Sequence, residues 1–228
     1  MTKLNTAIAY SSALDPYKAG REAAQTAKKI IGEEIDFAQV FCSSQDDNSI
    51  KDVARGVDEI LGSTCRWAGC AMPGLNKQVL ILASSSQHMR VEAGIGGGLS
   101  KNTARAVSSA VTDVLSKLDL DKNIEQYLSY IAMQENKKHT LTTLQPYNII
   151  ALFPQASLNN AVVKELTKAL SSLVPISGYI GRIFNKDTIF EDSILLFLQT
   201  FDQDVGANQS QYKLLTFVPS QNFIGHKY

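Results

Sequence analysis

The sequence predicts a mixed α/β fold in which a strand–helix–strand–strand unit occurs twice and forms mixed sheets flanked by helices. Short apolar runs of strand length alternate with longer segments whose apolar residues recur at helical spacing. The longer segments also carry clear helix start and stop residues. The order strand, helix, glycine-centred strand, apolar strand then appears in both halves of the chain.

Length and charge limit the classes of partner. At 228 residues the chain can form one large domain or two fused halves. Its 22 Lys and Arg residues balance 22 Asp and Glu residues, which argues against nucleic acid as a main partner. The sequence contains no long apolar run and no signal peptide, so we expect no membrane partner. Three cysteines are too few for a disulfide framework and indicate reduced thiols in a cytoplasmic protein.

Helix boundaries are clear in the first half of the sequence. Asp15-Pro16 starts a helix that Gly32 ends, and Asn48 or Ser49 starts a second helix that Gly62 ends. Further helices are expected at residues 104–118, at 121–134, and from Ser157 or Asn159 to residue 173.

Nine segments have the length and composition of strands. They are residues 6–11, 37–42, 65–71, 79–84, 89–95, 147–153, 176–180, 193–199 and 213–218. The three between residues 65 and 95 have no helix between them, which predicts antiparallel hairpins.

The internal repeat aligns residues 37–41 with 149–153, and Gly69 with Gly178. We therefore expect a single domain over residues 1–228 made of two repeats. These run over about 5–134 and 146–220, with a linker at 135–145. The alternative is that the alignment reflects only the regular alternation common to all α/β chains.

Small and polar residues cluster where predicted strands end. Strand ends that lead into helices are common ligand sites, and helix N-termini there favour a carboxylate or phosphate. This predicts a small anionic or zwitterionic ligand. The alternative is that the clusters are only turn and cap residues. The candidate ligand-binding residues are Ser11, Ser12, Cys42, Ser43, Gly69, Cys70, Gly96, Gly97, Gly98, Ser100 and Arg182.

Three features have specific competing interpretations. The run Gly94–Ser100 could form an anion-binding nest of backbone N–H groups, or a plain turn, and it lacks the Gly-Lys-Ser/Thr ending of a P-loop. Arg182 could bind a carboxylate or remain solvated. Trp67 could stack on a ligand, although a core position is favoured.

Catalytic and metal-binding residues are not predicted. Cys70 could be a nucleophile, but none of the histidines His88, His139 and His226 lies in a triad setting, so a buried structural thiol is favoured. Cys65 and Cys70 alone cannot complete a zinc site.

Several short motifs resemble a known family. Tyr10-Ser11-Ser12 followed by Asp15-Pro16, then Ala68–Cys70, and later Ser177-Gly178-Tyr179, are similar to segments of the N-terminal FIST domain. The resemblance covers roughly residues 5–205. The sequence departs from the family after Cys70, where Ala71–Leu75 lacks the usual acidic residue, and the family's C-terminal partner domain is not expected here.

The resemblance implies an intracellular sensory domain of bacterial signal transduction that binds a small ligand such as an amino acid. We therefore expect a non-enzymatic ligand-binding domain without a cofactor, whose protein partner is a second copy or a downstream signalling protein. The alternatives are an interaction module without a ligand, in which residues 212–228 self-associate, and a haem-based gas sensor, since some family members bind haem. A cysteine-dependent hydrolase or transferase is the remaining alternative.

Overall fold

The computed structural model describes residues 4–32, 34–87, 89–117, 147–154, 156–170 and 176–201. These residues form two compact units. The first joins residues 2–89 to residues 180–191, and the second joins residues 90–179 to those from 192 onward. The predicted helix at 121–134, the linker at 135–145 and the strand at 213–218 lie outside the described residues.

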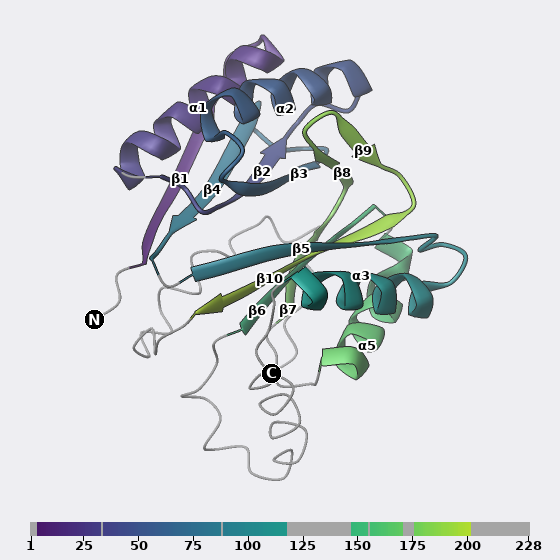
Figure 1. Cartoon of the computed structure of the whole chain (residues 1–228). Helices are drawn as coiled ribbons and strands as arrows, with labels where there is room; N and C mark the ends of the chain where they lie inside the picture. The colour runs from purple at the N-terminus through teal and green to yellow at the C-terminus, as the bar shows by residue number, and fades with distance from the viewer. Residues whose placement is uncertain are drawn as a thin grey trace. The chain divides into compact units, whose positions relative to one another are not determined.

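The first unit is a six-stranded mixed sheet of order β1-β4-β2-β3-β8-β9. Only β2 and β3 run parallel, and the other neighbours are antiparallel. Figure 1 shows α1 and α2 side by side on one face of this sheet. Its elements are β1 (Asn5–Ser11), α1 (Pro16–Ile31), β2 (Phe37–Cys42), α2 (Asp47–Leu61), β3 (Arg66–Ala71), β4 (Val79–Ser85), β8 (Arg182–Asn185) and β9 (Thr188–Phe190).

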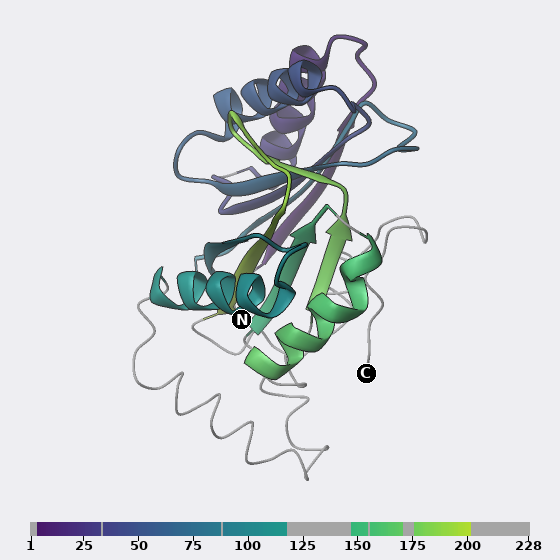
Figure 2. The same ribbon diagram turned by 90° about the vertical axis from the view of Figure 1, so that its right-hand side faces the viewer.

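The second unit is a four-stranded sheet of order β5-β10-β6-β7. Figure 2 shows α3 and α5 beside this sheet, and α3 contacts both α5 and β10. Its elements are β5 (Met89–Gly97), α3 (Thr103–Lys117), β6 (Tyr147–Phe153), the 3₁₀ turn η2 (Ala156–Leu158), α5 (Asn159–Leu170), β7 (Ile176–Ile180) and β10 (Ser193–Phe201).

The predicted helix ends are largely confirmed. The Asp15 side chain accepts a hydrogen bond from the Lys18 N–H, and Gly32 ends α1 in the left-handed conformation. Gly62 ends α2, but the N-cap of that helix is Asp46, which accepts from the Ser49 N–H. Asp46 lies just before the predicted Asn48 or Ser49, and its ionised carboxylate is a strong N-cap.

The prediction of hairpins between residues 65 and 95 is wrong. β4 pairs with β1 and β2 instead of β3, and β5 joins the second sheet. β3 pairs with β2 on one side and with β8 on the other. β8 and β9 form a hairpin that the sequence analysis did not predict, because its strands have only four and three residues.

The two sheets repeat one strand order. β1-β4-β2-β3 in the first unit corresponds to β5-β10-β6-β7 in the second. The fold class, two repeated α/β units with mixed sheets flanked by helices, is thereby confirmed. β5 and α3, which the expected boundaries placed in the first repeat, occupy in the second sheet the places that β1 and α1 hold in the first.

Candidate functional site

Several of the predicted ligand residues lie at one end of the strands of the first sheet. β1 and β2 are both antiparallel to β4, and β3 is parallel to β2. The carboxyl ends of β1, β2 and β3 therefore lie at the same end of the sheet. Ser11, Ser12, Cys42 and Ser43 lie there, as the sequence predicted. Arg182 lies there too, because it pairs with Ala71 at the end of β3.

The polar groups at this end of the sheet bind groups of the same chain. The Ser11 hydroxyl donates to Glu22 at 2.8 Å, and the Ser43 hydroxyl donates to the Gln78 Oε1 atom at 2.8 Å. The Gln78 N–H donates to the Ser11 carbonyl, which ties the start of β4 to the end of β1. These bonds explain the serines as turn and connection residues.

Arg182 does bind a carboxylate, but the carboxylate belongs to the same chain. Its guanidinium donates to Asp47 at the start of α2 and to the Gln45 carbonyl. The pair joins β8 to the loop before α2, so Arg182 is held in place within the first unit.

Gly69 and Cys70 serve packing. A Cβ at Gly69 would lie 2.0 Å from the Phe184 ring, so only glycine leaves room for that ring. Phe184 in turn packs against Trp67, edge to face, at 6.3 Å between ring centroids, which confirms the core role of the tryptophan. Cys70 is buried, and burial raises the pKa of its thiol well above the ordinary value.

The glycine run Gly94–Ser100 lies in the second unit. A Cβ at Gly94 would meet the Ala110 carbonyl oxygen at 2.1 Å, and one at Gly96 would meet that of Ala106 at 1.8 Å. These two glycines therefore allow α3 to pack directly on β5. Gly97 follows at the end of the strand.

The last part of this run forms a cradle of donors around Asp192 of the same chain. The N–H groups of Gly98 and Leu99 donate to the Asp192 carbonyl at 2.8 and 3.1 Å. The Ser100 N–H and hydroxyl donate to the Asp192 carboxylate at 2.7 and 3.0 Å. Gly98 has φ of 73°, a left-handed conformation that favours glycine. These donors are therefore already used within the chain, and the anion-binding nest stays a prediction.

The structure adds one candidate that the sequence analysis missed. Gln39 lies at the middle of β2, a strand of which every residue is buried, and its side chain is only 2% exposed. Neither its Nε2 nor its Oε1 atom has a hydrogen-bond partner within the described part of the chain. A buried amide without partners costs about 1–3 kcal/mol for each unsatisfied group.

The neighbours of Gln39 within the first sheet are apolar. It shares a face of β2 with Phe37 and Phe41, and its register partners on the neighbouring strands are Ala68 and Leu82. This face is opposite the α1–α2 side, where Ala38 and Val40 point into the helix-covered core. A signal was present in the sequence, because period-two alternation places Gln39 between two phenylalanines on one buried face.

Within the described ranges, no group of three or more His, Cys, Asp or Glu side chains could hold a metal ion. The three histidines considered for haem or for a triad all lie outside those ranges. No helix within them is long and apolar enough to cross a membrane.

No family model matches this sequence, and no curated protein matches it. Among solved structures it resembles a chorismatase, at 8% identity and a TM-score of 0.51, over 86% of this chain and 74% of that one. It also resembles a cyanuric acid hydrolase from A. caulinodans, at 11% identity and a TM-score of 0.46, over 88% and 71% of the two chains. The likeness to the chorismatase shows a shared two-unit α/β fold. The prediction of a non-enzymatic domain is wrong on this evidence, because the chorismatase is an enzyme.

Proposed function

We propose that this chain binds a small amino-acid-like or amide-like molecule, and that the Gln39 side chain is the polar anchor of the site. The observation that carries the proposal is the buried amide with two unused hydrogen-bonding atoms. Nearly all buried polar groups in proteins have partners, so an unused pair at the centre of a sheet favours a ligand that supplies them.

The chemistry of the amide defines the ligand class. Nε2 donates and Oε1 accepts, so the complementary ligand presents an acceptor beside a donor. A free amino acid does so through its carboxylate and ammonium groups, and a primary amide does so through one planar group. The phenylalanines and the leucine around Gln39 favour an apolar remainder.

Two further observations support this class. The resemblance to the FIST N-terminal domain favours amino acids as ligands and a role in signal transduction. The shared fold favours a small molecule, since the chorismatase acts on one.

A thermal-shift panel of amino acids, primary amides and monocarboxylates tests the proposal. At a ligand concentration one hundred times Kd, we expect a gain of about 2.7 kcal/mol. For a chain of this length that gain corresponds to a rise in Tm of roughly 5–10 °C. Following the ligand by NMR after binding shows whether it is released unchanged or converted.

The decisive variant is Gln39→Met, which keeps the side-chain length and removes both polar atoms. We expect it to abolish the ligand-induced shift and to raise the free energy of unfolding by about 1 kcal/mol, since an unsatisfied amide is removed. Gln25→Met, at an exposed position of α1, is the matched control and should keep the shift. Retention of the shift in Gln39→Met, or the absence of any stabilising compound, would count against the proposal.

A further inference from the structure

β1 is an edge strand with one fully paired side. Its seven residues pair in continuous register with β4, from Asn5 opposite Ser85 to Ser11 opposite Val79. No described strand pairs with its other side, since β1 stands at the end of the sheet order. Within the described part of the chain, the outer edge therefore presents a row of backbone donors and acceptors.

The direction of these groups follows from one hydrogen bond. The Ser11 carbonyl accepts from the Gln78 N–H, so the backbone groups of Ser11 face β4. Backbone groups alternate in direction along a strand, and those of Thr6, Ile8 and Tyr10 therefore face outward. The side chains of the same three residues are exposed, Ile8 by 46% and Tyr10 by 58%.

The residues of β1 themselves carry none of the features that normally prevent strand pairing. Edge strands are usually protected by charged residues, proline or a bulge. Residues 5–11 read Asn-Thr-Ala-Ile-Ala-Tyr-Ser, with no charge and no proline, and their register with β4 contains no bulge. One charge does stand beside this edge, at the end of the strand, where Lys77 lies over the Tyr10 ring at 4.8 Å from its centroid.

We propose that β1 pairs antiparallel with β1 of a second copy of this chain, about a two-fold axis that passes between the two Ile8 residues. This register places Ile8 opposite Ile8, and Thr6 opposite Tyr10 on both sides of the axis. All three outward-facing residues then form backbone pairs, whereas a shift of two residues would leave some of them unpaired. Aromatic and β-branched residues stand opposite one another, which is a favourable cross-strand combination. The interface is isologous and closes at a dimer.

Two measurements on the full chain test this dimer. Sedimentation at micromolar concentration should give twice the mass of one chain. Ile8→Lys places two charges opposite each other at the axis and should weaken the dimer roughly tenfold or more. Ile30→Lys makes the same change at an exposed residue of α1 and should leave the dimer intact. Circular dichroism checks that both variants are folded.

Cross-linking tests the register. Opposite residues of an antiparallel pair have Cβ atoms about 4.5–5.5 Å apart, so Ile8→Cys should give a covalent dimer with a short bifunctional thiol reagent. Ile30→Cys should not, and the three native cysteines are buried and should not react. A monomer at all concentrations, a dimer that Ile8→Lys leaves unchanged, or a dimer that Ile8→Cys fails to cross-link would each overturn the proposal. None of these outcomes bears on ligand binding at Gln39.

Discussion

The cysteines show how burial decides chemistry at the scale of one residue. Burial raises the pKa of Cys42 and of Cys65 to about 12, and it also raises the pKa of Cys70 above its ordinary value. A thiol is nucleophilic only as the thiolate, so these three groups are inert near neutral pH. This disfavours the cysteine-dependent hydrolase or transferase that the sequence left open.

The same pKa values predict a loss of stability in alkali. In the unfolded chain the thiols ionise near 9.0, whereas in the folded chain Cys42 and Cys65 ionise near 12. Their contribution is fully present below pH 9 and is lost as the pH rises towards 12. We expect a decrease of about 1 kcal/mol per thiol between pH 8 and pH 10, measured by urea unfolding.

The double variant Cys42→Ala/Cys65→Ala provides the control for this prediction. It should lose less stability over the same pH interval, because the two titrating groups are absent. An equal loss in the variant would assign the alkaline effect to other residues. Alkylation of the wild type near pH 7.5 should require denaturant.

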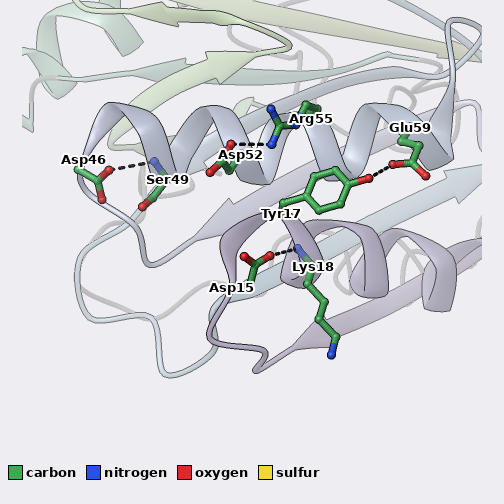
Figure 3. A network of polar contacts seen from close by, with 8 residues as sticks. All are labelled: Asp15, Tyr17, Lys18, Asp46, Ser49, Asp52, Arg55 and Glu59. Carbon is green, nitrogen blue, oxygen red and sulfur yellow. Dashed lines mark hydrogen bonds and ion pairs between the residues drawn. The ribbon is translucent and has the colours of Figure 1, made fainter.

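At the scale of elements, α1 and α2 are joined in two different ways. Figure 3 shows the polar side of the pair, where the Tyr17 hydroxyl of α1 donates to Glu59 of α2, and Arg55 binds Asp52 within α2. Arg55 also lies over the Tyr17 ring, at 5.2 Å from its centroid. These contacts are exposed, and ion pairs of this kind contribute little to stability.

Close backbone packing is the stronger connection between these helices. A Cβ at Gly20 would lie 2.4 Å from the Val53 carbonyl oxygen, and one at Gly56 would lie 2.2 Å from that of Tyr17. The obstructing atoms are backbone, so they cannot rotate away. The two glycines therefore set the distance between α1 and α2.

Gly20→Ala and Gly56→Ala should each destabilise the protein. Alanine favours a helix over glycine by about 1 kcal/mol, but forcing two helices apart costs roughly 1–3 kcal/mol, so we expect a net loss of about 1–2 kcal/mol. Chemical unfolding followed by circular dichroism measures it. Gln25→Ala, at an exposed position of α1, should be neutral or slightly stabilising. If Gly20→Ala and Gly56→Ala were as stable as the wild type, this account of the packing would be contradicted.

At the scale of the whole molecule, the chain completes its first sheet with a hairpin from the second half. β8 and β9 lie between β7 and β10 in the sequence, yet they extend the first sheet beyond β3. Phe184 of this hairpin is fully buried among core residues of the first unit. The first unit is therefore incomplete without residues 180–191.

Phe184→Ala should destabilise the first unit by about 3–5 kcal/mol, because it leaves a cavity beside Gly69 and Trp67. Trp67 is the only tryptophan of the chain, so its fluorescence during urea unfolding reports on this unit. Phe190→Ala, at the partly exposed end of the same hairpin, should cost less than half as much. Equal effects would show that the hairpin does not contribute to the core as described.

The sequence by itself determined the class of fold, the first two helices with most of their end residues, and the repeat of strand and helix. These depend on local signals, namely apolar periodicity, Asp15-Pro16 at a helix start and glycines at helix ends. Which sheet a strand joins depends on pairings distant in sequence, and only the tertiary structure placed β5 in the second sheet and β8 beside β3. The same applies to the candidate site: Ser11, Ser43, Arg182 and the cradle at residues 98–100 bind groups of the same chain, and most of those partners are distant in sequence. Gln39 became the candidate because only the tertiary structure shows that its buried amide has no partner among the described residues.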